Sequence, residues 1–217
     1  NKIRPFAFLP LGGATNGSVL VGHNYTYLGS TWGKIVDILM ETQIMNPIIY
    51  FDELDKVSKT EYGKEIIGIL THLTDPTQNK DFQDKYFSGI SFDLSKVLFI
   101  FSYNDKYSID KILRDRIQEI EVKSLTKRDK LIISKKYVLP EIFQTVGFSN
   151  NEIIISNNQI NDIIDNYTYE AGARKLKEKL FEIIRNINTF NLTKISKARP
   201  MRIFSDRLNS IISRNYA

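Results

Sequence analysis

Short, continuous apolar runs alternate with amphipathic stretches in the first half of this chain, and this alternation limits the fold more than any other feature. Apolar runs occupy residues 5–9, 47–51, 97–102 and 117–122, and helical periodicity occupies residues 32–40 and 65–73. Continuous apolar runs between helices are typical of parallel strands that are buried on both faces. We therefore expect an α/β layer in which helices cover both faces of a parallel sheet.

The second half of the chain has a helical pattern instead. Apolar residues recur at helical spacing over residues 128–139, 157–166 and 170–190. Pro140, Gly147 and asparagine-rich stretches lie between these segments and are typical of helix ends and turns. This half is expected to form a small bundle of helices.

The change of pattern near Ser124 predicts a domain boundary. The expected parts are an α/β domain over residues 1–124, a small all-α domain over residues 125–192, and a C-terminal basic segment without an assigned role over residues 193–217.

Composition excludes several classes of protein. The 217 residues are 42% hydrophobic and 25% charged, as in ordinary globular proteins, and no apolar run approaches the length of about 20 residues that a membrane span needs. The absence of cysteine excludes disulfides and agrees with a reducing compartment, the cytoplasm or an organelle matrix. The net charge of +5 is spread along the chain, so it supports nucleic-acid binding only weakly and is typical of a solvated surface.

Two adjacent carboxylates follow the apolar run at residues 48–51. Parallel strands deliver their last residues to the sheet edge where ligands bind in such folds, so Asp52 and Glu53 are candidates for a binding site. In a nucleoside triphosphatase, the first carboxylate would hold Mg²⁺ through its water shell and the second would polarise the attacking water. The alternative is a strand end capped by solvated acids.

Several further motifs carry a resemblance to a known family. In chain order they are Leu11-Gly12-Gly13, Gly22-His23, Thr26-Tyr27-Leu28-Gly29, Gly33-Lys34-Ile35, Asp52-Glu53-Leu54-Asp55-Lys56, Asp75-Pro76-Thr77-Gln78-Asn79, Phe82, Asp84, Tyr86, Phe92 to Val97, Asp115-Arg116, and Tyr167 to Leu176. Over about residues 5–187 the chain resembles the AAA+ ATPase segment of Lon-type proteases, and the pattern at residues 75–86 is the most specific part. The resemblance implies an AAA+ P-loop-type parallel sheet with helices on both faces, followed by a small all-α lid domain.

The resemblance also implies a site for ATP and Mg²⁺. Asp52 matches the residue that binds Mg²⁺ through water, and Glu53 matches the residue that activates the attacking water. Asn104 matches the sensor 1 position, where an amide orients that water without adding charge. Arg174 matches sensor 2, which reaches the γ-phosphate from the lid domain.

Arg116 matches the arginine finger, which acts on the nucleotide of a neighbouring subunit. A planar guanidinium suits the spread charge of a transferring phosphoryl group. Arg114 is a competing candidate for this role. Because the finger acts across an interface, the resemblance implies a homo-oligomer, a hexamer.

Tyr27 and Leu28 match the aromatic-aliphatic pair of the first pore loop, which grips unfolded protein substrates. Trp32 stands where the family usually has proline, and we interpret it as a packing residue. A second pore loop is expected around residues 61–63.

Two parts of the family pattern have no counterpart in the sequence. The phosphate-binding loop Gly-x-x-x-x-Gly-Lys-Thr would precede Asn1, and the Ser-Lys peptidase would follow the lid, whereas nothing after residue 187 resembles it. We therefore expect this segment alone to bind ATP poorly and to cleave no peptide bond. Departures from the family at residues 14–21 and 108–111 indicate a divergent member.

Three functions are compatible with these features. The first is the ATPase motor of a Lon-like ATP-dependent serine protease, which couples hydrolysis to unfolding and translocation in protein quality control. The second is a degenerate AAA+ remnant with a binding or structural role. The third is a nucleic-acid-binding AAA+ ATPase such as a clamp loader, which the positive charge favours and the motif at residues 75–86 opposes.

Overall fold

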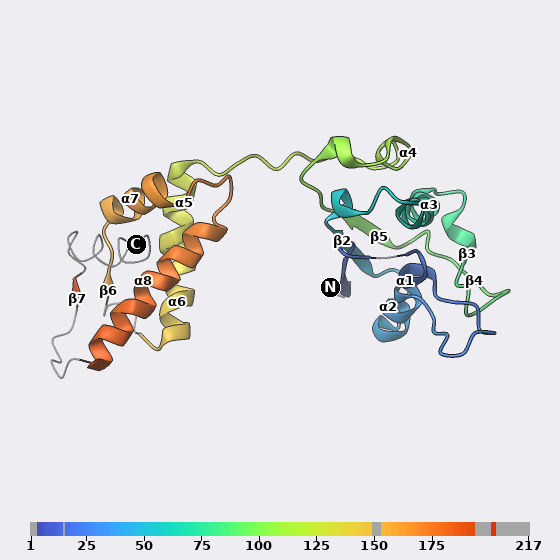
Figure 1. Ribbon diagram of the computed structural model, residues 1–217, viewed down its shortest axis with the longest axis horizontal. Coiled ribbons are helices and arrows are strands. Elements are labelled where there is room, and N and C mark those ends of the chain that lie inside the picture. Colours follow the sequence, from blue (N-terminus) through green and yellow to red (C-terminus); the bar gives the residue numbers. More distant parts are fainter. Residues whose placement is uncertain (1–3, 15, 149–152, 194–200, 203–217) are drawn as a thin grey trace. The chain divides into compact units, whose positions relative to one another are not determined.

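The computed structural model describes residues 4–14, 16–148, 153–193 and 201–202 (Figure 1). The helices and strands in chain order are β1 (Phe6–Pro10), α1 (Ser18–Val21), α2 (Lys34–Thr42), β2 (Ile48–Asp52), α3 (Glu61–Thr74), β3 (Phe82–Gln83), β4 (Ser91–Phe92), β5 (Leu98–Phe101), α4 (Lys111–Arg114), α5 (Lys127–Ile133), α6 (Leu139–Val146), β6 (Ile153–Ile154), α7 (Asn157–Tyr167), α8 (Arg174–Thr193) and β7 (Met201–Arg202). Short 3-10 turns occupy Leu54–Lys56, Asn79–Asp81 and Lys106–Ser108, and a π-helical turn occupies Ser134–Val138.

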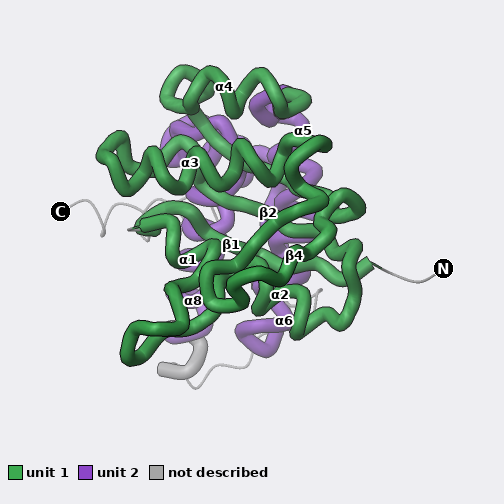
Figure 2. The backbone as a smooth tube through the Cα atoms, turned by 90° about the vertical axis from the view of Figure 1, so that its right-hand side faces the viewer, with its two compact units in different colours: residues 1–120 green, residues 121–217 purple. Residues whose placement is uncertain are grey.

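The chain divides into two compact units (Figure 2). Unit 1 comprises Asn1–Ile120 and unit 2 comprises Glu121–Ala217. The structure therefore divides after Ile120, whereas the boundary proposed from the sequence lies after residue 124. The basic segment expected over residues 193–217 lies outside the described residues, apart from residues 193 and 201–202.

Unit 1 is built on a parallel sheet with the strand order β1-β2-β5. Phe8 pairs with Tyr50, and Tyr50 pairs with Ile100, so equivalent positions of the three strands lie side by side. The apolar runs at residues 5–9, 47–51 and 97–102 therefore form strands, as the sequence predicts. The prediction of a parallel α/β layer followed by a helical region is confirmed.

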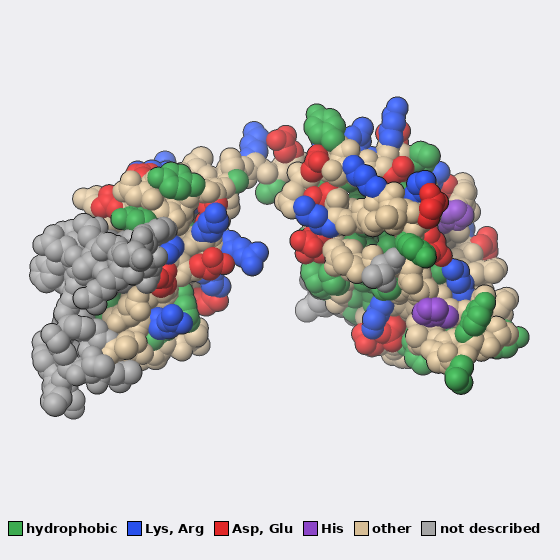
Figure 3. All heavy atoms as spheres, viewed as in Figure 1, with side chains coloured by type: hydrophobic (Ala, Val, Ile, Leu, Met, Phe, Trp, Pro, Cys, Tyr) green, Lys and Arg blue, Asp and Glu red, His purple; other side chains and the backbone are tan. Residues whose placement is uncertain are grey.

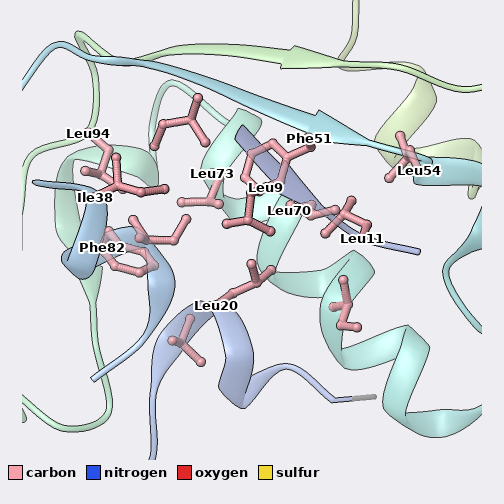
Figure 4. Packing of buried hydrophobic residues seen from close by; sticks show 14 of the residues in the cluster. Leu9, Leu11, Leu20, Ile38, Phe51, Leu54, Leu70, Leu73, Phe82 and Leu94 are labelled. Carbon is pink, nitrogen blue, oxygen red and sulfur yellow. The ribbon is translucent and has the colours of Figure 1, made fainter. Parts of the chain in front are cut away.

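One face of this sheet packs against helices. Leu9, Ile49 and Phe51 point to that face and are buried. They share one hydrophobic cluster with residues of α1, α2, α3 and α4 (Figure 4). The helical members include Leu20, Ile35, Ile66, Leu70, Leu73 and Leu113. Burying each such side chain stabilises the fold by about 1.5–3 kcal/mol relative to leaving it exposed.

The opposite face of the sheet is open to solvent in the described part of the chain. Phe6, Phe8, Leu98 and Ile100 are exposed there, and the Phe8 ring stacks on the Tyr50 ring with centroids 5.8 Å apart. The sequence pattern predicts helices on both faces because both faces are apolar. Among the described residues, helices cover the face of Leu9 and leave the face of Phe8 exposed.

The strand expected over residues 117–122 does not form, so this prediction is wrong. These residues follow α4 as a turn and an irregular segment. Ile120 and Val122 are 80% and 90% exposed. A strand needs a hydrogen-bonding neighbour, and β5 pairs within the described residues only with β2. Apolar composition alone cannot supply that neighbour.

Unit 2 consists mainly of helices around a second hydrophobic cluster. Its buried members are Val138, Leu139, Ile142, Phe143, Ile153, Ile155, Ile160, Ile163, Ile164, Leu176, Leu180, Ile183, Ile184 and Ile187. Two of its helices begin with capping boxes, Thr126 with Asp129 at α5 and Ser156 with Gln159 at α7. In each box, both side chains bond to backbone N–H groups that the helix leaves unpaired. None of the helices in the described part of the chain combines the length and the apolar composition that a membrane span requires.

Pro140 does not separate two helices, contrary to the sequence-based expectation. The chain passes from α5 through the π-helical turn Ser134–Val138 directly into α6. Proline has no N–H, and its ring clashes with the carbonyl one α-helical turn earlier. The wider π turn removes the need for that hydrogen bond. Gly147, with φ 87°, ends α6.

Candidate functional site

The acid pair lies at the carboxyl end of β2. Asp52 is the last residue of the strand and is half-buried, whereas Glu53 is exposed. Glu53 has φ 58° and ψ 45°, which is the left-handed region. Such a conformation costs on the order of 1–3 kcal/mol for a residue with a side chain and persists only where the surroundings impose it.

Ser102, directly after β5, holds this acid pair. Its hydroxyl donates to Oδ1 of Asp52, and its oxygen accepts from the backbone N–H of Glu53 at 3.4 Å. Its carbonyl accepts from the backbone N–H of Leu54 at 3.0 Å. Sequence reasoning did not single out Ser102. The feature of the sequence that could have identified Ser102 is its position directly after the apolar run that forms β5.

Gly12 forms the other side of the acid pair. The backbone N–H of Leu11 donates to the Asp52 carbonyl at 2.9 Å, which brings the segment after β1 beside β2. A Cβ on Gly12 would lie 2.0 Å from Oε2 of Glu53. The Glu53 carboxylate therefore lies against the backbone of Gly12, and a side chain at that position would displace the carboxylate from this place.

Asn104 follows β5 and is exposed. Because β2 and β5 are parallel neighbours, Asn104 and Asp52 belong to loops at the same edge of the sheet. The turns after the two strands, Leu54–Lys56 and Lys106–Ser108, contact each other. The structure thus brings together Asp52, Glu53 and Asn104 at one end of unit 1.

Arg116 forms an ion pair within unit 1. Its Nη1 donates to Oδ2 of Asp75, and the guanidinium side chain is about one-third exposed. Oδ1 of Asp75 accepts from the backbone N–H of Thr77 at 2.9 Å and from its hydroxyl at 2.7 Å. Arg116, followed by these Thr77 bonds, holds the pKa of Asp75 far below its ordinary value. Sequence reasoning did not identify Asp75 as the partner of Arg116.

Arg114, the competing candidate for the finger, is also tied to unit 1. Its Nη1 donates to the carbonyl of Lys106 at 3.3 Å, and its Nε lies 3.8 Å from Oε1 of Glu119. The pKa of Tyr103 is raised, mainly because the residue is partly buried and to a smaller extent because the Glu119 carboxylate is near. Both arginines therefore have carboxylate neighbours within their own unit.

Arg174 begins α8 in unit 2, and its side chain is 91% exposed. Its Nε lies 3.4 Å from Oε1 of Glu178, one helical turn along. The structure describes the two units separately, so Arg174 is placed within unit 2 only.

Polar contacts position the start of α8. The Glu170 carboxylate accepts from the backbone N–H groups of Lys175 and Leu176 at 3.0 and 2.9 Å. The buried Lys130 donates from Nζ to the Glu170 carbonyl at 2.5 Å. These contacts hold the loop that leads into Arg174.

The loop over residues 24–31 presents apolar side chains to solvent. Tyr27 is 66% exposed and Leu28 is fully exposed, and Gly29 has φ 80°. The backbone N–H of His23 donates to the Thr31 carbonyl at 3.0 Å and closes the base of the loop. An exposed apolar tip on a closed base is able to contact another polypeptide.

The residues expected around a second pore loop are helical. Residues 61–63 form the first turn of α3, where Tyr62 is exposed. Gly63 is buried, and a Cβ there would lie 1.6 Å from the Ser58 carbonyl oxygen. Tight backbone packing therefore requires glycine at this position.

Charged side chains of both signs lie on the visible face of unit 1 (Figure 3). On the face shown in Figure 3, Lys and Arg side chains are interspersed with Asp and Glu. Within the described residues, no group of three or more His, Cys, Asp and Glu side chains could hold a metal ion. Mg²⁺ keeps several waters when it binds, so a single carboxylate such as that of Asp52 could hold it through its water shell.

Comparison with known protein families gives two matches. Residues 11–125 match the ATPase family associated with various cellular activities, abbreviated AAA. Residues 144–199 match the Lon protease AAA+ ATPase lid domain. The first match covers the acid pair, Asn104 and Arg116, and the second covers Arg174.

Among individual proteins, the chain is similar to Lon proteases. It is 40% identical over 185 residues to a Lon protease homolog of Acanthamoeba polyphaga mimivirus, covering 85% of this chain and 18% of that protein. It is 37% identical over 196 residues to the Lon protease of Campylobacter concisus, covering 90% and 24%. It is 38% identical over 184 residues to that of Clostridioides difficile, covering 85% and 23%. The chain spans about a quarter or less of the length of these relatives.

Proposed function

This chain belongs to the AAA family of ATPases, as a segment of the Lon type, and on that premise we propose that it is the motor of a protease that unfolds and translocates proteins. Its proposed cofactors are ATP and Mg²⁺, and its proposed assembly is a hexamer of identical subunits. Its proposed substrates are unfolded proteins. In this proposal the peptidase domain of the Lon type cleaves peptide bonds. This segment supplies the mechanical work of unfolding and translocation.

The observation that carries the proposal is the constrained acid pair. Glu53 is exposed in a left-handed conformation against Gly12, and Ser102 bonds to both Asp52 and Glu53. A glutamate held in this way can accept a proton from a water that attacks the γ-phosphate. Asp52 would hold Mg²⁺ through water, and the ion would neutralise charge on the phosphates.

Three further residues have proposed roles in hydrolysis. Asn104 would orient the attacking water from the loop beside the acid pair. Arg174, exposed at the start of α8, would contact the γ-phosphate. Arg116 would stabilise the charge of the transferring phosphoryl group in a neighbouring subunit, a contribution of about 10³–10⁵ in rate for such arginines.

The proposed substrate contact is the loop over residues 24–31. Tyr27 and Leu28 offer a ring and an aliphatic side chain to solvent, and neither depends on the sequence of the polypeptide that it touches. Movement of the loop during the ATP cycle would pull the polypeptide.

Glu53→Gln in the full-length protein tests the proposal. The amide cannot take up a proton, so ATP hydrolysis is expected to fall by about 10²-fold or more while ATP binding persists. Turnover is measured as phosphate release and binding with a fluorescent ATP analogue. Glu41→Gln, which changes an exposed carboxylate on α2, is the matched control and should leave turnover unchanged. Full turnover in Glu53→Gln would contradict the proposed role of the acid pair.

The alternative functions have less support. The residues proposed for hydrolysis are all present, which a degenerate remnant would not require. Nucleic-acid binding needs a dense, one-sided basic patch, and the face shown in Figure 3 carries interspersed charges of both signs.

A further inference from the structure

Residues 75–86 are here called the signature segment. One aspartate of this segment contacts the candidate arginine finger, and another contacts the residue that follows the candidate pore loop. Asp75 contacts Arg116, as described above. Its other carboxylate oxygen is occupied by Thr77, so the carboxylate has one orientation. A bond between two charged groups is stronger and more directional than a neutral one. Asp75 therefore limits where the Arg116 guanidinium can lie.

Asp84 makes a comparable contact at the other end. Asp84 is 1% exposed, and its Oδ2 accepts from the backbone N–H of Gly33 at 2.8 Å. Oδ1 accepts from the backbone N–H of Tyr86 at 2.9 Å. Gly33 directly precedes α2 and follows the loop over residues 24–31. Asp84 thus ties the end of that loop to the signature segment.

Backbone bonds reinforce this junction. The N–H of Lys85 donates to the Val21 carbonyl at 2.7 Å, just before the loop begins. A Cβ on Gly22 would lie 2.8 Å from Oδ1 of Asp84, so the chain passes too close for a larger residue. Both ends of the loop are therefore attached to residues 84–86.

Trp32 adds an aromatic contact at the same place. Its ring meets Tyr86 edge to face at 5.8 Å and stacks near Phe87 at 6.1 Å between centroids. Tyr86 and Phe87 also meet edge to face, at 5.2 Å. Trp32 thus packs on the end of the signature segment, and its exposed fraction of 37% leaves one side to solvent.

The signature segment is compact between its two ends. The N–H groups of Asn79 and Asp81 donate to the carbonyls of Asp75 and Gln78 at 2.9 and 3.1 Å, and the N–H of Leu94 donates to the Asn79 carbonyl at 2.9 Å. These bonds restrict bending of the segment.

Core packing also restrains the segment. Phe82 is 8% exposed, and Figure 4 shows it beside Ile38 and Leu94. Close-packed interiors transmit displacement instead of absorbing it. A shift at one end of the segment should therefore move the other end.

We propose that the signature segment is a rigid strut in which Asp75 positions Arg116 and Asp84 positions the loop over residues 24–31. Asp75 and Asp84 are positioning residues, because each acts through the group that it holds. The strut would link the arginine that faces a nucleotide with the loop that grips a polypeptide. This inference rests on the proposed function and adds a physical connection between its two activities.

Asp75→Asn in the full-length protein tests the first end. Asparagine keeps the size and loses the charge that orients Arg116. The kcat of ATP hydrolysis is expected to fall about 10- to 100-fold, as for a misplaced transition-state group, while KM for ATP stays within about twofold. Asp75→Glu, which keeps the charge, should recover part of the loss. A purely structural role would lower activity only in proportion to the folded fraction.

Asp84→Asn tests the second end. Its amide nitrogen would face an N–H donor, so one of the two bonds is lost. The measured quantity is the ratio of ATPase rates with and without reduced, carboxymethylated α-lactalbumin, a permanently unfolded polypeptide. The strut predicts that this ratio falls to about one, since the loop no longer moves with Arg116. Trp32→Leu removes the aromatic contact with Tyr86 and should lower the same ratio. This variant replaces Asp84→Asn in the test if Asp84→Asn does not fold.

Asp93→Asn is the matched control for these variants. Asp93 also accepts a bond from a backbone N–H two residues ahead, that of Ser95 at 2.9 Å, and the charged groups near it are Lys80 and Lys96. Thermal unfolding of every variant measures the folded fraction.

The strut is overturned if Asp75→Asn behaves like Asp93→Asn and the second-end variant does so too. The second-end variant is Asp84→Asn or, if that does not fold, Trp32→Leu. It is also overturned if Trp32→Leu and Asp84→Asn both keep the stimulation ratio of the wild type. Glu53→Gln separates the two levels of inference. If Glu53→Gln abolishes turnover and the strut variants are silent, the strut alone fails; if Glu53→Gln keeps turnover, the proposed function fails.

Discussion

At the residue scale, the close approach of Gly12 to Glu53 joins two segments that are far apart in the sequence. A methyl group on Gly12 would overlap Oε2 of Glu53, which must then move by about 1 Å or more. The place of the Glu53 carboxylate thus depends on the absence of a side chain at residue 12, which is far from it in the sequence. The glycine-containing motif after β1 and the acid pair after β2 form one arrangement.

We predict that Gly12→Ala lowers ATP turnover of the full-length protein about tenfold or more, because Glu53 loses its position. Phosphate release measures the effect, and thermal unfolding separates it from loss of structure. The control is Gly68→Ala on the exposed side of α3, where no heavy atom lies within 4 Å of the new Cβ. This control should stabilise the helix by about 0.5–1 kcal/mol and leave turnover unchanged. Equal turnover in both variants would contradict the contact.

The Asp75–Arg116 pair makes stability depend on pH. Because the pKa of Asp75 is lowered in the folded protein, its stabilising contribution is fully present above the ordinary value of about 3.8 and is lost as pH falls through the lower folded-state pKa. We predict that Asp75→Asn is less stable than the wild type near neutral pH and that the difference shrinks in acid. Urea unfolding at several pH values measures this dependence.

Arg116→Gln removes the main cause of the lowered pKa, so it should reproduce that pH dependence. The double variant should lose less stability than the two single losses added together, because both changes break one interaction. Additive losses would show that the ion pair does not contribute.

At the element scale, the start of α8 depends on a side chain that precedes it. The first N–H groups of a helix have no partner within the helix, and Glu170 accepts from those of Lys175 and Leu176. Lys130 then holds the Glu170 carbonyl, which links α5 to this start. The position of Arg174 in unit 2 follows from these contacts.

We predict that Glu170→Ala destabilises unit 2 by about 1 kcal/mol, which is typical for loss of a helix cap. Hydrogen exchange should accelerate at the amides of Lys175 and Leu176, because they lose their acceptor. The control is Glu178→Ala, which removes only an exposed partner of Arg174 and should cost at most about 0.5 kcal/mol. Unchanged exchange in Glu170→Ala would contradict the capping role.

At the scale of the whole molecule, the open face of the sheet is the most consequential feature. Phe6 and Phe8 are 60% and 56% exposed, and Leu98 and Ile100 of β5 are exposed on the same face of the sheet. In register, Tyr50 of β2 lies between Phe8 and Ile100, so the three strands present one continuous apolar row. Exposed apolar patches of this kind promote association between molecules.

We predict that the 217-residue chain self-associates through this face. Phe8→Ser should lower the average mass measured by light scattering and the binding of an apolar fluorescent dye. Ile132→Ser is the control, since Ile132 is an exposed apolar residue of α5 in unit 2. If both variants associate as strongly as the wild type, the sheet face is not responsible.

Much of the architecture could be predicted from the sequence, because local patterns encode it. Apolar runs at β1, β2 and β5 and helical periodicity at α2 and α3 each depend on residues close together in the chain. The acid pair was expected at a strand end for the same reason. The helical half was recognisable from the spacing of its apolar residues, although the π turn before Pro140 was not.

The remaining features depend on residues that are far apart in sequence. Residues 117–122 have the composition of a strand but no neighbour to pair with, and composition carries no information about neighbours. Ser102 holds Asp52 because β5 is the strand that pairs with β2. Asp75 meets Arg116 because the turn after α3 places the carboxylate beside the guanidinium. The sequence by itself determined which segments become strands and helices, since propensity and periodicity are local. Only the tertiary structure decided which side chains constrain one another, because those contacts follow from register and packing between distant elements.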